Sequence, residues 1–205
     1  SAYSSSGINT LGDENITLID TSLSASTLNN LDGKTSGTVN AAIINTLSGT
    51  VSDLNTAFTS GGITGLGNAA ISVNNGTIST AQANNLAAAT SGVVTATISD
   101  GDMATLAGLT ETGNAYTIAI TDNSVTAAAL NTLDGKTSGT VNANSVNTLS
   151  GTAADLNTAY ASSGISNLGN EAVTLTDTSL AASSLNTLDG HTSGTVNANS
   201  VNTLS

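Results

Sequence analysis

The chain has 205 residues, a net charge of −12 and only two basic residues, Lys34 and Lys136, and it contains no cysteine, proline or tryptophan. Nucleic acids and anionic membrane surfaces are bound through clustered lysine and arginine, so this charge excludes both classes of partner. No apolar run approaches the roughly 20 residues of a membrane-spanning helix, so we expect no membrane insertion.

One segment recurs along the whole chain. The sequence at 130–151, LNTLDGKTSGTVNANSVNTLSG, occurs again nearly unchanged at 28–49 and 185–205. Equivalent positions, such as Leu133 and Leu188, define a unit of length 55, a second unit shortened by eight, a third unit of the full length and a partial unit. Both ends fall inside a unit and neither resembles a capping repeat, so we expect an uncapped slice of a longer array.

Extended runs alternate apolar and polar residues with period two, which predicts half-buried strands. They lie at 16–19, 37–40, 62–66, 71–73, 116–120 and 173–176. One full period divides into three pieces of the length of a solenoid coil, at 34–49, 50–68 and 69–88. We therefore expect about 11 coils, with strands stacked about 4.8 Å apart.

Short helical corners are expected between the strands. In residues 184–190, Leu185 and Leu188 are three apart and face the same way on a helical turn, and Gly190 follows as a left-handed terminator. Thr152 and Asp155 have the spacing of an N-cap residue and its N3 partner. Helices of one or two turns do not stand alone, so we expect them only as corners of a sheet stack.

The shortened unit has an irregular segment at 94–108, VTATISDGDMATLAG, which aligns with 39–49 after four added residues. The DLNTAF-type piece that should follow it is largely missing. A stack in which each coil contacts only its neighbours tolerates such a loss.

These observations predict a mainly β fold, a repeat solenoid of the β-helix type with short helical corners. Residues 1–205 are expected to form this single repeat solenoid. A leucine-rich-repeat-like α/β horseshoe is the alternative, although its repeats should be more uniform in length.

The LNTLDGKTSGTV, NEAVTLTDTSLAAS and TAADLNTAYASSGI stretches resemble the long repeats of giant secreted or cell-surface proteins of marine cyanobacteria. The LNTLDG corner is also similar to LNYLDG-type segments of phage tail-fibre proteins. The first resemblance covers nearly the whole chain, and the second covers little more than the corner of each copy. Both imply an extracellular or cell-surface location and a structural or adhesive role, with no enzyme activity and no cofactor.

Acidic residues are the only candidates for a metal site. Asp100 and Asp102 form the densest acidic spot, with Glu111 not far along, and they are the first candidates for calcium, which prefers several oxygen ligands. The glycine- and aspartate-rich calcium repeat of β-rolls is absent. Aspartate also recurs in ordinary turn positions, which are Asp20, Asp32, Asp122, Asp134, Asp177 and Asp189.

No catalytic constellation recurs with the repeats. His191, the only histidine, replaces Lys34 and Lys136 at one repeat position, so we read it as an exposed coil residue. Asparagines at matching positions, such as Asn142 and Asn147, are expected to form amide ladders and turn bonds. Three aromatic residues share a further repeat position and are expected to fill a layer of the core or its edge, namely Tyr3, Phe58 and Tyr160.

Three functions remain open, and none is enzymatic. The first is a structural extracellular filament or surface-fibre segment that associates end to end or with neighbouring fibres, because strand edges at the ends of a stack are unpaired. The second is the stalk of an adhesin or phage-type fibre that presents a binding domain elsewhere. The third is ice binding by a hydroxyl-rich face, for which the candidates are Thr117, Thr121, Thr174 and Thr176.

Overall fold

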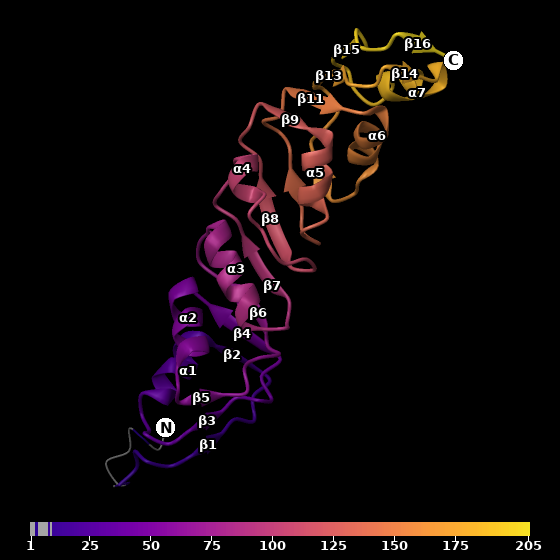
Figure 1. Cartoon of the computed structure of the whole chain (residues 1–205). Helices are drawn as coiled ribbons and strands as arrows, with labels where there is room; N and C mark the ends of the chain where they lie inside the picture. Colours follow the sequence, from indigo (N-terminus) through magenta and orange to yellow (C-terminus); the bar gives the residue numbers. More distant parts are fainter. Residues whose placement is uncertain (1–2, 4–7, 9) are drawn as a thin grey trace. The chain divides into compact units, whose positions relative to one another are not determined.

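The computed structural model describes Tyr3, Ile8 and residues 10–205, which form two compact units. The first comprises the chain up to residue 78 together with residues 82–97, and the second comprises residues 79–81 and 98–205. Each unit combines parallel strands with helices (Figure 1). No helix in the described part of the chain is long and apolar enough to cross a bilayer.

The first unit contains two parallel sheets, with strand orders β1-β3-β5 and β2-β4-β6-β7. Its strands are β1 (Ile16–Thr17), β2 (Ser22–Ser24), β3 (Val39–Asn40), β4 (Thr46–Gly49), β5 (Ile63–Thr64), β6 (Ala70–Val73) and β7 (Val94–Thr97). Its helices are α1 (Ala25–Asp32), α2 (Val51–Thr59) and most of α3 (Thr80–Ala89). Figure 1 shows α1 and α2 together beside β2 and β4, the strands against which they pack.

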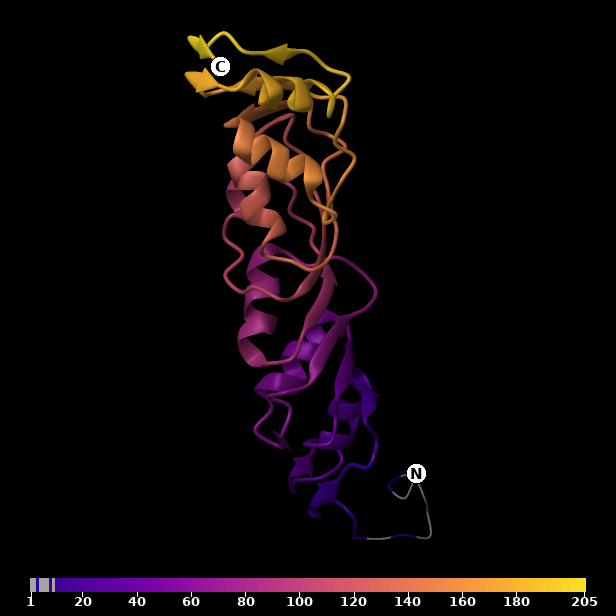
Figure 2. The ribbon, with the colours of Figure 1, turned by 90° about the vertical axis from the view of Figure 1, so that its right-hand side faces the viewer.

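The second unit repeats this plan with strand orders β8-β10-β12, β9-β11-β13-β15 and β14-β16. Its strands are β8 (Ala115–Ala119), β9 (Ser124–Thr126), β10 (Val141–Asn142), β11 (Thr148–Gly151), β12 (Ile165–Ser166), β13 (Ala172–Leu175), β14 (Ser179–Leu180), β15 (Val196–Asn197) and β16 (Thr203–Leu204). Its helices are α4 (Met103–Leu106), α5 (Ala127–Asp134), α6 (Ala153–Ala161) and α7 (Ala182–Asp189). Figure 2 shows α5 and α6 side by side, and the two helices are in contact.

The expected mainly β solenoid of the β-helix type with short helical corners is wrong. The fold is α/β, with parallel sheets and seven helices in the part of the chain that the structure describes. The alternative class, α/β, is the one observed. That residues 1–205 form a single body stays a prediction.

The coil is also longer than expected. Leu47 on β4 pairs with Leu23 of the preceding strand in its ladder and with Ile71 of the following one. This spacing exceeds the length of any of the pieces expected at 34–49, 50–68 and 69–88, so those pieces and the total of about 11 coils are wrong. The reason is that one coil holds two strands and a helix, and sequence reasoning assigned one strand to each piece. The extended runs themselves are confirmed as parts of β1, β3, β5, β6, β8 and β13.

The unit of length 55 in the sequence comprises two coils and one short stretch that connects them. Val141 on β10 pairs with Ile165 on β12, and Val173 on β13 pairs with Val196 on β15, so each pair spans about one coil. The short stretch from Ile165 to Val173 completes the period. Because β13 also pairs with β11, this stretch moves the chain from one parallel ladder to the next.

Capping residues explain why polar sequences form helices here. Thr152 accepts from the N–H of Asp155 at 3.1 Å and donates to its carboxylate at 2.8 Å, which confirms the predicted N-cap pair. Thr50 and Asp53 form the same pair at the start of α2. Gly190 has a right-handed backbone with φ −72°, so its predicted left-handed conformation is wrong.

The core consists of small aliphatic side chains aligned by the strand register. Leu149 is fully buried and pairs with Val125 and Val173 of the neighbouring strands, and α5 and α6, whose Leu130 and Leu156 are also fully buried, pack against the same strand. Burial of one such side chain contributes about 1.5–3 kcal/mol. A thin core of this kind therefore depends on exact repetition of aliphatic residues rather than on large aromatic rings.

Candidate functional site

A side-chain contact that recurs between coils is built on the Thr-Ser-Gly turn, and we call it the threonine clamp. The Oγ1 atom of Thr192 donates to the carbonyl of Glu171 at 2.7 Å and accepts from the N–H of Gly194 at 2.9 Å. Gly194 approaches the Glu171 carbonyl so closely that a Cβ atom would overlap it. The same bonds recur in the turns of Thr35, Thr90 and Thr137.

The aspartates of the LDG corners serve a second contact between coils. The carboxylate of Asp134 accepts from the hydroxyl of Ser162 at 2.7 Å, and that hydroxyl accepts from the N–H of Gly164 at 3.0 Å. Asp32 and Ser60 repeat this bond at 2.6 Å in the first unit. Both carboxylates are therefore already hydrogen-bonded to the next coil.

The calcium candidates Asp100 and Asp102 each serve a helix N-terminus. Asp100 accepts from the N–H of Thr80 on α3 at 2.7 Å, and Asp102 is the N-cap of α4, accepting from the N–H of Thr105 at 2.9 Å. Hydrogen bonds from the backbone N–H and then the hydroxyl of Thr105 lower the pKa of Asp102. Negative charge is favourable at these positions because the N-terminus of a helix carries partial positive charge.

The described part of the chain places no third acidic or histidine ligand with Asp100 and Asp102. Among the described residues, no group of three or more His, Asp or Glu side chains is placed to hold a metal ion. Calcium at Asp100 and Asp102 thus stays a prediction that this geometry does not favour. Two other aspartates also accept from the first N–H of a helix, Asp122 from Met103 and Asp177 from Ala153.

Sequence reasoning missed the buried carboxylate of Glu171. Its side chain is 0% exposed and accepts from the hydroxyl of Tyr160 at 2.8 Å and from the N–H groups of Gly169 and Asn170. Burial and then the hydrogen bond to Glu171 raise the pKa of the Tyr160 hydroxyl well above its usual range. The ring of His191 stacks on Tyr160 with centroids 5.2 Å apart.

The residues that match Tyr160 and Glu171 change together from one repeat to another. The pair Tyr160 and Glu171 repeats as Tyr3 and Glu14, whereas the intervening unit has Phe58 and Ala69. Comparison of the repeats at this fixed spacing could have found the pair. Its alternation between polar and apolar forms indicates a structural contact rather than a catalytic one.

The hydroxyl groups proposed for ice binding are not gathered on one sheet. Thr117 lies on β8 and Thr174 on β13, which belong to different sheets of the second unit, and Thr121 and Thr176 lie outside the strands. The expected asparagine contacts are present: Asn142 accepts from the N–H of Asn144, and Asn147 donates to Asn123.

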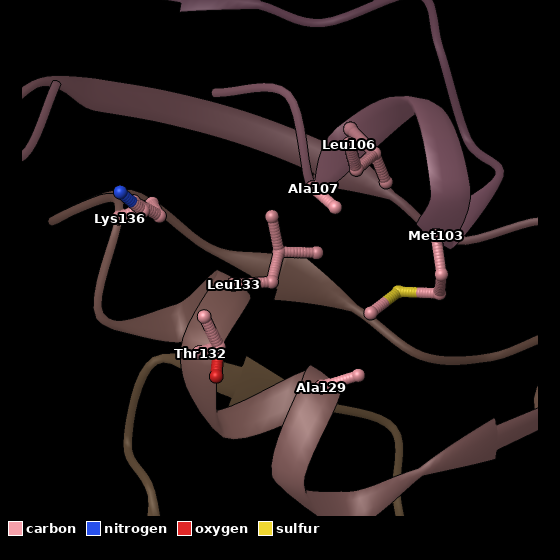
Figure 3. Close-up of a pocket in the computed structure, with 7 residues that line it drawn as sticks. All are labelled: Met103, Leu106, Ala107, Ala129, Thr132, Leu133 and Lys136. Carbon is pink, nitrogen blue, oxygen red and sulfur yellow. The ribbon is translucent and has the colours of Figure 1, made fainter. Parts of the chain in front are cut away.

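A pocket lies where the repeat is irregular, between α4 and α5. It has a volume of about 270 Å³ and is lined by five apolar side chains, Thr132 and Lys136. Figure 3 shows Leu133 of α5 facing Leu106 of α4, with Met103 and Lys136 at opposite ends. The apolar residues of its lining are Met103, Leu106, Ala107, Ala129 and Leu133.

The short length of α4 accounts for this pocket. The corresponding helices of the regular units, α2 and α6, have nine residues, whereas α4 has four. A single turn leaves this flank of α5 uncovered, while α6 covers the other flank and accepts a hydrogen bond from Asn131 through the carbonyl of Asp155. The dropped segment that shortens the second repeat therefore also opens the pocket.

Comparisons of the chain with protein-family models, with curated proteins and with solved structures found no match.

Proposed function

We propose that this chain is a non-catalytic structural segment of an extracellular filament or surface fibre. The observation that supports the proposal is the threonine clamp, which recurs in four coils with the same donors and acceptors. Each clamp adds side-chain bonds to the backbone bonds between parallel strands. Resistance to separation of the coils is thereby distributed along the chain rather than concentrated at one site.

The polar side chains support the same role. Asp32 and Asp134 at the LDG corners and Asp177 at the N-terminus of α6 bond to neighbouring coils, and the glutamate at position 171 is fully buried. With two basic residues in 205, the chain also offers few cleavage sites to trypsin-like proteases, which suits exposure outside a cell. The resemblance to repeats of secreted and cell-surface proteins agrees with this location.

Association with other copies, end to end or side by side, is part of the proposal. Parallel ladders leave unpaired backbone groups at their outer strands, and such edges can pair with another chain. The net charge of −12 opposes this association at low ionic strength, so we expect it to strengthen as salt screens the charge.

Antibody labelling and electron microscopy of the source material test the proposal. Antibodies raised against the recombinant chain should label thin fibres outside the cell at repeated intervals along their length. Antibody absorbed with the same chain is the control. Label confined to the base of a short projection would favour the stalk of an adhesin, and label confined to compact particles inside the cell would overturn both.

A further inference from the structure

The repeat departs from its pattern at the pocket between α4 and α5, which we call the α4/α5 pocket. The only methionine of the chain, Met103, forms one end of it. Ala129 stands where the other units have Thr27, Gln82 and Ser184, so a polar repeat position has become apolar here. Packing of the repeated coils explains residues that recur in each unit, but it does not explain Met103 and Ala129.

The lining has two chemically distinct parts. Leu106 and Leu133 are 0% and 3% exposed and form an apolar floor, and the flexible side chain of Met103 extends it. At the other end lies the half-buried Lys136, whose ammonium donates to the carbonyl of Thr110 at 3.3 Å. No aspartate or glutamate lines the pocket, although the chain contains 14 acidic residues.

We propose that the α4/α5 pocket binds a small aliphatic carboxylate, with its hydrocarbon chain over Leu106 and Leu133 and its carboxylate at Lys136. The charge on Lys136 selects an anion, because the positive charge has no carboxylate among the lining residues. The volume of about 270 Å³ limits the ligand's size. It exceeds the about 150 Å³ that holds one benzene ring, and it lies below the range of about 300–1,000 Å³ for drug-sized ligands.

Lys34 provides an internal comparison. It occupies the same repeat position as Lys136, and the positions of α1 that match Ala129 and Thr132 hold Thr27 and Asn30. A surface lysine on a repeat is thus not sufficient for the site that we propose. At Lys136, the lysine is combined with the apolar floor formed by Leu106 of α4 and Leu133 of α5.

Titration of the isotope-labelled full chain with octanoate, followed by amide nuclear magnetic resonance shifts, tests the proposal. We expect saturable shifts confined to α4, α5 and the turns that follow them, which contain Ala107 and Lys136. Octanol, which has the same chain without the charge, should bind about fivefold more weakly, as expected for a partly exposed ion pair. Lys136→Gln should remove this difference, and Lys34→Gln should leave it unchanged.

A second variant tests the pocket itself. Ala129→Leu places a larger side chain in the lining at an exposed helical position, so the fold should persist and binding of both ligands should be lost. Circular dichroism verifies that each variant is folded.

Several outcomes would overturn the proposal. These are the absence of saturable shifts, equal shifts at α1, α5 and α7, or octanoate binding that Lys136→Gln does not weaken. Broadening of α4 and α5 signals with protein concentration and without ligand would show that a second copy of the chain occupies the pocket instead.

Discussion

The hydroxyl of Tyr160 donates a 2.8 Å hydrogen bond to the fully buried carboxylate of Glu171 in the same coil. Glu171 also accepts from the backbone at Gly169 and Asn170, so a buried charge is held by three donors. The equivalent pair in another unit, Phe58 and Ala69, has neither the hydroxyl nor the carboxylate. The chain thus contains a polar and an apolar version of one contact.

This pair predicts strong coupling between two substitutions. Glu171→Ala leaves three partly buried donors without this acceptor and should cost about 2–3 kcal/mol, and Tyr160→Phe should cost about 1 kcal/mol. The double variant recreates the Phe58 and Ala69 combination, so its cost should be at least about 1 kcal/mol below the sum. Urea unfolding measures all four proteins, and simple additivity would contradict the contact.

Alkaline pH should destabilise the protein through the buried Tyr116. Burial and then the negative charge of Glu111 raise the pKa of Tyr116 to about 12, whereas the unfolded chain ionises near pH 10. The contribution of Tyr116 is therefore complete below about pH 10 and is lost as the pH rises from there through about 12. Urea unfolding at several alkaline pH values should show this loss, and Tyr116→Phe should reduce it. Spectroscopic titration with all tyrosines ionising near pH 10 would contradict it.

The threonine clamp predicts a clear difference between neighbouring threonines. Thr137→Val removes the acceptor of the Gly139 N–H and the donor to the Tyr116 carbonyl, so it should cost about 1–3 kcal/mol. Thr140→Val, at an exposed position beside β10, is the matched control and should change stability by less than about 0.5 kcal/mol. Equal effects of the two substitutions on the urea midpoint would count against the clamp.

Substitution of glycine by alanine should change stability in opposite directions at two positions. A Cβ atom at Gly139 would overlap the carbonyl of Tyr116, so Gly139→Ala should destabilise the second unit by more than about 1 kcal/mol. Gly61 has nothing within 4 Å of its Cβ position and its φ lies outside the left-handed region, so Gly61→Ala should gain about 0.4–1 kcal/mol. Thermal unfolding of both variants checks the order, and a loss at Gly61 as large as that at Gly139 would refute it.

Sequence reasoning located the strands and caps because their signals are local. Alternation around Val39 and Val173 and the spacing of Thr152 and Asp155 depend on nearby residues. The α/β class was only the alternative because short helices such as α1 and α5 are stabilised by packing and by their N-cap bonds rather than by propensity. The coil length was missed because pairing of Leu47 with Ile71 is a long-range contact that no local pattern encodes.

The candidate sites also differ in whether their signal is local in the sequence or depends on the fold. Asp100 and Asp102 are adjacent enough in sequence to suggest one metal site, but the fold directs them to the N-termini of two different helices. The α4/α5 pocket depends on the length of α4 and on its packing beside α5, so it was not visible before the fold was known. Comparison of the repeats would nevertheless have shown Ala129 and Met103 as departures from the pattern.

Stretching of single molecules held at both ends tests most directly whether the chain is built to bear tension. One coil runs from Leu23 to its ladder partner Leu47, so its release should lengthen the chain in steps of about 80 Å, each following a distinct peak of force. Thr137→Val together with Thr192→Val should lower some of these peaks, and Thr140→Val should not. Smooth extension without force peaks in the unaltered chain would contradict a structural role for the repeated contacts between coils.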